Sequence, residues 1–66
     1  MSRVYTGKHM CRLLEEHGWD LKRIKGSHHI YGKPGERSII TVPVHGSKTL
    51  KLGLCRSILR MAGLEE

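Results

Sequence analysis

The apolar residues change their spacing twice along the chain, and this change restricts the fold. Near the N-terminus they recur at helical intervals and predict a helix over 6–17: Met10, Leu13, Leu14 and His17. Thr6 is a suitable N-cap for this helix, and Gly18 suits the left-handed position that follows it. Toward the C-terminus the helical spacing returns and predicts a second helix, which begins between 50 and 53 and ends at Gly63, with this apolar stripe: Leu54, Cys55, Ile58, Leu59 and Ala62.

Three segments between the predicted helices have the pattern of strands. They cover 19–25, 28–33 and 37–44, with Gly26-Ser27 and a turn over 32–36 between them. In the first strand we expect one face to hold Trp19, Leu21 and Arg23. The third strand alternates most clearly, with Ile40, Val42 and Val44 on one side.

The order helix, strand, strand, strand, helix predicts an α+β fold of αβββα type. The simplest packing is a three-stranded antiparallel sheet with both helices on one face, which leaves the other face open to solvent. At 66 residues the chain is a single domain, 1–66, too short for a dinucleotide-binding fold or a TIM barrel. It holds no apolar run of the roughly 20 residues that a membrane span needs, and the N-terminus does not resemble a signal peptide. We therefore expect a cytoplasmic protein with no membrane partner.

The charged residues are segregated along the chain. Lys and Arg number 12 against six Asp and Glu, which gives a net charge of +6 and a pI of about 9.8. Acidic residues are absent from 21–35 and again from 37–64. Net charge alone can serve solubility, but this segregation favours a polyanionic partner such as a nucleic acid.

The cysteine and acidic residues give no sign of a metal site. Cys11 and Cys55 lie in the two predicted helices, and we expect reduced thiols in the core. The sequence has no CxxC motif and no acidic cluster, so no metal or other cofactor is expected.

The pair His28-His29 lies in a basic segment and is the strongest candidate for chemistry. If Ile30 packs in the core, alternation puts His28 at the entrance of the strand and three side chains on the open face: His29, Tyr31 and Lys33. Histidine can transfer protons near neutral pH, and RNA supplies its own nucleophile, the 2′-hydroxyl. One or two histidines with several cations therefore suffice to cleave RNA without a metal.

Four segments in this order resemble the HicA toxin family. They are Gly-Trp at 18–19, Lys-Gly-Ser-His-His-Ile-Tyr at 25–31, Thr-Val-Pro-Val-His at 41–45 and Ile-Leu-Arg-Met-Ala-Gly-Leu at 58–64. The resemblance spans about residues 6–64. It implies a fold like that of a double-stranded-RNA-binding domain. It also implies a metal-independent endoribonuclease that cleaves mRNA until a HicB antitoxin masks the site.

The resemblance also implies roles for individual residues. In the family a Gly-Ser-His triplet opens the second strand and its histidine is catalytic, which corresponds to His28 here, with His29 as the rival. Contacts with the RNA are expected from the surrounding glycine, serine, histidine and lysines: Lys22, Lys25, Gly26, Ser27, His29, Lys33, Lys48 and Lys51. Arg23 is a further candidate phosphate contact. The second proton-transfer group stays open among His29, His45, a lysine and water.

Two other functions fit the same residues. One is a non-catalytic module that binds double-stranded RNA, in which the histidines only contact the ligand. The other is a subunit whose positive charge docks an acidic protein, and an acidic antitoxin would satisfy this reading and the toxin reading together.

Overall fold

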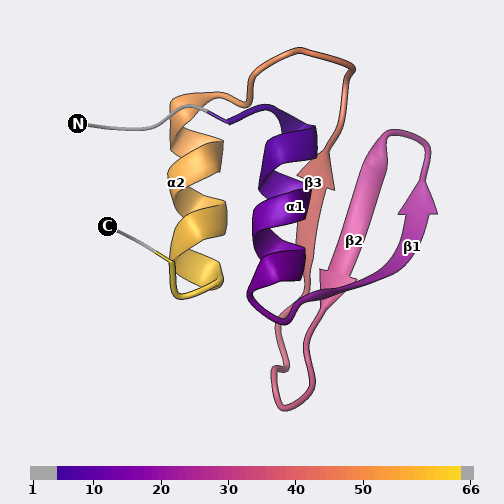
Figure 1. Ribbon diagram of the computed structural model, residues 1–66, viewed down its shortest axis with the longest axis vertical. Helices are drawn as coiled ribbons and strands as arrows, with labels where there is room; N and C mark the ends of the chain where they lie inside the picture. The colour runs from indigo at the N-terminus through magenta and orange to yellow at the C-terminus, as the bar shows by residue number, and fades with distance from the viewer. Residues whose placement is uncertain (1–4, 65–66) are drawn as a thin grey trace.

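The computed structural model describes residues 5–64 and shows the predicted order of elements (Figure 1). The elements are α1 (Gly7–Glu16), β1 (Asp20–Lys25), β2 (His28–Gly32), β3 (Ile40–Pro43) and α2 (Leu52–Met61). The three strands form one antiparallel sheet in the order β1-β2-β3, and the two helices lie side by side on one face of it. The αβββα prediction is therefore confirmed. The expectation about the N-terminus concerns residues 1–4 and lies outside the described residues.

The ends of α1 follow the capping rules that the sequence suggested. The hydroxyl of Thr6 accepts a hydrogen bond of 3.0 Å from the backbone N–H of His9, as an N-cap residue does. Gly18 follows the helix with a φ of +91°, the left-handed conformation that favours glycine. His17 is the C-cap residue, and its Nδ1 lies 2.9 Å from the carbonyl oxygen of Leu13. Its ring is exposed, so it does not belong to the buried stripe of the helix.

A two-residue turn, Gly26-Ser27, joins β1 to β2. Gly26 has a φ of +60°, and Ser27 does not have a positive φ. A positive φ at the first of two turn residues alone is typical of a type II′ hairpin, in which glycine takes that position. A Cβ on Gly26 would meet no atom within 4 Å, so the backbone conformation and not close packing requires glycine here.

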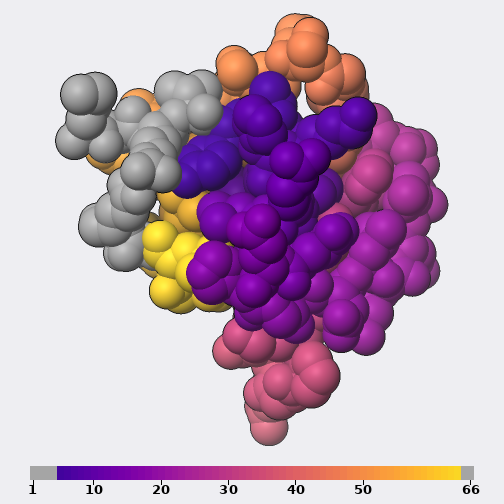
Figure 2. All heavy atoms as spheres, in the orientation of Figure 1, coloured from indigo at the N-terminus to yellow at the C-terminus, as the bar shows by residue number. Residues whose placement is uncertain are grey.

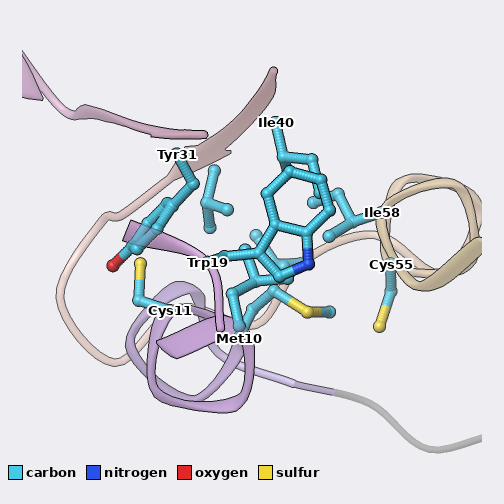
Figure 3. Close-up of a cluster of buried hydrophobic side chains, with 10 residues drawn as sticks. Met10, Cys11, Trp19, Tyr31, Ile40, Cys55 and Ile58 are labelled. Atoms are coloured by element: carbon cyan, nitrogen blue, oxygen red, sulfur yellow. The ribbon is translucent and has the colours of Figure 1, made fainter. Parts of the chain in front are cut away.

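The core fills the space between the helices and the covered face of the sheet (Figure 3). Every element except β1 contributes a buried side chain, and so do the segments that carry Trp19 and Leu50. The buried residues are Met10, Cys11, Leu14, Trp19, Tyr31, Ile40, Val42, Leu50, Cys55 and Ile58. The prediction that both cysteines are core residues is confirmed.

The strand boundaries and the face of one side chain differ from the sequence prediction. The third strand is Ile40–Pro43 and not 37–44, and the first begins at Asp20, so Trp19 is a buried residue just before it. The register of β1 against β2 shifts between Leu21 and Arg23. Because of this bulge, Leu21 and Arg23 do not share a face: Leu21 pairs with Tyr31 and Arg23 pairs with Ile30.

The second helix packs with a narrower stripe than predicted. It starts at Leu52, within the predicted range, and Gly63 follows it with a φ of +74°. Cys55 and Ile58 are buried as expected, but Leu54 keeps 39% of its surface exposed. Leu54 lies 100° round the helix from Cys55, and the sheet ends with β3, so no strand covers that side.

A short backbone connection joins the segments that precede the two helices. Thr6 forms an isolated antiparallel bridge with Thr49, and the N–H of Leu50 donates a 2.7 Å hydrogen bond to the carbonyl of Tyr5. Both helices therefore start at the same end of the molecule, and both run toward the other end (Figure 1). None of the helices within 5–64 is long and apolar enough to cross a membrane.

Candidate nucleic-acid interface

The sheet register decides on which face His28 lies. Tyr31 pairs with Ile40, and both are buried beneath the helices. His29 pairs with Val42, which is fully buried, so His29 also faces the helices and is only half-buried there because it lies near the end of the strand. Alternation then places His28 on the face that no helix covers, which we call the open face.

The predicted alternation of β2 is therefore wrong. It rested on Ile30 packing in the core, but Ile30 is half-buried on the open face, opposite Arg23 and Thr41. Tyr31, which was expected on the open face, keeps 1% of its surface exposed and is a core residue. The large aromatic ring, not the isoleucine, fills the space under the helices. The correction favours His28 over His29 as the residue accessible from the open face.

Two residues flank His28 across the sheet. Lys25 lies directly opposite on β1, and Pro43 lies directly opposite on β3. The side chains of His28 and Lys25 are both exposed. Directly opposed residues of an antiparallel pair have β-carbons about 5 Å apart, so a phosphate can contact this histidine and this lysine together.

A second pair of cations lies farther along β1, at the bulge. Arg23 is exposed and lies opposite Ile30 on the open face. The carbon chain of Lys22 covers Gly32. A Cβ added to this glycine would lie 3.1 Å from Cε of Lys22. Lys22 therefore also lies over the open face, and the bulge puts two consecutive basic side chains on one side of the strand.

The same end of the sheet receives further basic residues from the β3–α2 connection. This end, which we call the hairpin end, consists of the β1–β2 turn, the end of β3, the β3–α2 connection and the starts of both helices (Figure 1). His45 and Lys48 lie in the connection, and the N–H of Lys48 donates a 3.1 Å hydrogen bond to the carbonyl of His45. Lys51 is the N-cap residue of α2, and it makes no side-chain capping bond. The first N–H groups of that helix are thus available to an anion.

The acidic residues gather at the opposite end. Within 5–64, each of them lies in the last turn of α1, at the start of β1 or in the β2–β3 connection: Glu15, Glu16, Asp20 and Glu36. In Figure 2 the β2–β3 connection protrudes at the bottom, and the β3–α2 connection forms the top. Neither helix has an acidic residue in its first turn. The positive ends of both helix dipoles add to the positive side chains of the hairpin end.

Lys33 is the predicted contact that the structure separates from the others. It follows β2 at the end distant from His28, about 16 Å away at the usual rise per strand residue. Its Nζ lies 5.7 Å from the centre of the Trp19 ring, a cation–π distance, and the side chain also passes over Gly18. Lys33 therefore lies on the helix side of the sheet, and its predicted place on the open face is wrong.

One basic residue of the hairpin end was missed by the sequence reasoning. Lys8 is exposed in the first turn of α1, where a positive charge opposes the helix dipole. Such an unfavourable position was the signal that could have identified it. The bridge between Thr6 and Thr49 and the hydrogen bond from Leu50 to Tyr5 show that this helix starts beside the connection that carries Lys48.

The described residues contain a polar cluster away from this interface. The hydroxyl of Tyr31 donates a 2.6 Å hydrogen bond to Oε2 of Glu15, and the thiol of Cys11 lies beside the hydroxyl (Figure 3). Burial raises the pKa of the Tyr31 phenol well above its usual range, and the contacts with Cys11 and Glu15 add to this. Within 5–64, no three His, Cys, Asp or Glu side chains are grouped so that they could hold a metal ion.

Comparison with known proteins identifies the family. Residues 7–64 match the family model described as the HicA toxin of bacterial toxin-antitoxin. No curated protein matches the sequence. The matched region contains all five elements and the whole of the hairpin end from Gly7 onward. The chain therefore belongs to the HicA toxin family, the toxin component of toxin–antitoxin systems.

Proposed function

We propose that this chain is a metal-independent endoribonuclease that cleaves mRNA and so inhibits translation, with His28 as a general acid or base. The observation that carries the proposal is the position of His28: exposed on the open face, opposite Lys25, at the end of the molecule distant from the acidic residues of 5–64. Family membership supports the toxin role, and the basic surface supports RNA as its target.

The chemistry follows from the groups at this end. The 2′-hydroxyl of RNA loses its proton to a base and attacks the adjacent phosphorus, and an acid then protonates the departing 5′-oxygen. An imidazole can serve in either role near neutral pH. The ammonium of Lys25 stabilises the negative charge that accumulates on the phosphate oxygens. The products are a 2′,3′-cyclic phosphate and a 5′-hydroxyl.

The other proposed RNA contacts fall into three groups. Gly26, which is exposed, and Ser27, which is half-buried, form the turn where the RNA backbone approaches His28. Lys48 and Lys51 hold a neighbouring phosphate at the start of α2. The remaining contacts lie along the strands or on the helix side: Lys22, Arg23, His29 and Lys33. Of these, Lys22 and Arg23 track the RNA along the open face, whereas His29 and Lys33 contact only RNA that passes beyond it.

The family implies an antitoxin partner, and we propose that it is of the HicB type. An acidic antitoxin matches the charge of the hairpin end and would mask His28 and Lys25 together. We also propose that the protein acts in the cytoplasm, where mRNA is translated.

The deciding experiment is an RNA cleavage assay of the purified chain in excess EDTA. It compares the parent with His28→Ala, with His29→Ala and with His17→Ala, whose histidine is exposed at the opposite end of α1. We expect cleavage in EDTA, cyclic phosphate ends, a loss of at least about 100-fold for His28→Ala, and near-parent rates for the other two. Circular dichroism checks that each variant is folded.

Three results would contradict the proposal. Loss of cleavage in EDTA would exclude the metal-independent mechanism. Full activity of His28→Ala would exclude His28 as the general acid or base. Binding of RNA by the folded parent without any cleavage would favour the alternative function, a non-catalytic module that binds double-stranded RNA.

A further inference from the structure

We propose that His45 is the second proton-transfer residue and acts with His28 on one phosphodiester. This inference rests on the ribonuclease activity proposed above, and it selects one residue from candidates that the sequence leaves open. The two histidines are 17 positions apart in the sequence, on β2 and just beyond β3.

The hydrogen-bond ladder brings the two residues to one end of the sheet. Pro43 is opposite His28, and the pairing continues one residue further, because the N–H of Val44 donates a 2.8 Å hydrogen bond to the carbonyl of Ser27. Val44 packs against the core, so its side chain is on the helix side. Alternation then directs the next residue, His45, to the open face, where its side chain is exposed.

The register also sets the spacing. His45 is two residues beyond the partner of His28, which is the diagonal position of an antiparallel pair. Diagonal residues have backbones about 7–8 Å apart, close enough for two imidazole rings to approach one phosphate from two sides. This is the arrangement that a base at the 2′-oxygen and an acid at the 5′-oxygen require.

The segment that carries His45 is anchored on both sides. Before it, Val44 is bonded to the turn that precedes His28, and after it the N–H of Leu50 is bonded to the carbonyl of Tyr5. Between these points the chain turns at Gly46, whose φ is +59°, and the N–H of Lys48 returns to the carbonyl of His45. The backbone of His45 is therefore held in place relative to β2 before RNA binds.

The rival groups are less well placed. His29 faces the helices, opposite the buried Val42. His17 lies at the far end of α1 and is bonded to a carbonyl of that helix. Lys25 lies opposite His28, and we assign its side chain to phosphate binding and not to proton transfer.

The step balances with two histidines. The neutral imidazole takes the proton of the 2′-hydroxyl as the bond from the 2′-oxygen to phosphorus forms. The bond from phosphorus to the 5′-oxygen breaks, and the protonated imidazole gives its proton to that oxygen. One ring gains the proton that the other loses, and no oxidant or further reactant is needed.

A substrate with a sulfur leaving group tests the pair. The main cleavage site of the parent is first mapped on an RNA transcript. Two oligonucleotides with this site are then made, one natural and one with sulfur in place of the bridging 5′-oxygen. A thiolate leaves without being protonated, so the sulfur substrate does not need the acid but still needs the base.

We expect His45→Ala and His28→Ala each to cut the natural RNA at least about 100-fold more slowly than the parent. Only one of them, the variant that lacks the acid, should cut the sulfur substrate at a rate within about tenfold of the parent rate. Each variant should bind a copy of the RNA with a 2′-deoxy residue at the site with affinity within threefold of the parent. His17→Ala is the matched control and should behave as the parent on both substrates.

Other outcomes overturn the inference. If His45→Ala cuts the natural RNA as fast as the parent does, His45 transfers no proton. If His45→Ala cuts both substrates more slowly by the same factor, and the sulfur substrate restores the rate of neither His45→Ala nor His28→Ala, the role of His45 is structural. If the parent cuts neither substrate, the proposed ribonuclease activity itself fails and the pair fails with it.

Discussion

Gly7 lies against the carbonyl oxygen of Pro43, at the point where α1 approaches the end of β3. A Cβ at this position would be 2.9 Å from Cα of Val44 and closer still to the Pro43 oxygen, both of which are backbone atoms that cannot rotate away. Because Pro43 is also the partner of His28, this contact holds α1 on the covered face of the sheet, behind the proposed site. A glycine in the first turn of α1 is therefore a packing requirement.

We predict that Gly7→Ala lowers the free energy of unfolding by about 2 kcal/mol, because overpacking against backbone outweighs the helix propensity of alanine. Gly53→Ala in the first turn of α2 is the matched control: a Cβ there meets no atom within 4 Å. It should raise the free energy of unfolding by about 0.5 kcal/mol. Urea denaturation measures both values. If Gly7→Ala and Gly53→Ala change the free energy of unfolding in the same direction, the contact of Gly7 with Pro43 does not govern the packing.

The local elements were predictable because each is specified by nearby residues. Thr6 and Gly18 mark the ends of α1, and Gly26-Ser27 marks the turn between β1 and β2. Periodicity and capping depend on side chains within one helical turn or one hairpin, so the order of elements could be predicted without tertiary contacts. The pair His28-His29 stood out in its basic segment, but the choice of His28 over His29 came from the family resemblance and not from periodicity.

The faces of the strands could not be predicted in the same way. Alternation fixes only relative sides, and choosing Ile30 rather than Tyr31 as the core residue reverses the whole of β2. The bulge after Leu21 inserts one residue and breaks the alternation of β1, which no local pattern announces. The proposed proximity of His45 to His28, and the separation of Lys33 from His28, both follow from this register.

Tyr31 gives a prediction at alkaline pH. Burial raises the pKa of its phenol, so the folded state disfavours the ionised form. The stability that this group contributes is present below its unfolded pKa of about 10 and is lost as the pH rises above that value. Between pH 10 and 11 the free energy of unfolding should fall by about 1 kcal/mol more in the parent than in Tyr31→Phe.

The comparison is made by urea denaturation from pH 7 to 11. At pH 7 Tyr31→Phe should be less stable than the parent by about 1 kcal/mol, because it lacks the hydrogen bond to Glu15. Tyr5→Phe is the control, since Tyr5 is only half-buried and its removal leaves Tyr31 in place. Between pH 10 and 11, Tyr5→Phe should lose as much free energy of unfolding as the parent does. If the free energy of unfolding of the parent and of Tyr31→Phe falls in parallel as the pH rises, Tyr31 is not the cause of the loss at alkaline pH.

The two cysteines should be protected in the folded protein. Cys11 and Cys55 keep 7% and 0% of their surface exposed, and burial raises the pKa of both thiols, so little thiolate forms. With an aromatic disulfide reagent at pH 8, both should react on the order of 100-fold more slowly in the native protein than in urea, which corresponds to an opening free energy of about 3 kcal/mol. Cys11→Ala and Cys55→Ala assign the rates. A rapid native reaction at either thiol would contradict its burial.

The last prediction concerns the charge asymmetry between the two ends. Lys25 lies opposite His28, whereas Arg37 lies in the β2–β3 connection at the far end. Each phosphate contact with single-stranded RNA contributes about 0.7 to the slope of log affinity against log salt concentration. In a His28→Ala background, which prevents cleavage during the measurement, Lys25→Ala should reduce the magnitude of this slope by about 0.7. Arg37→Ala removes the same unit charge and should leave the slope unchanged. Equal reductions in both variants would mean that the net charge, and not the hairpin end, attracts the RNA.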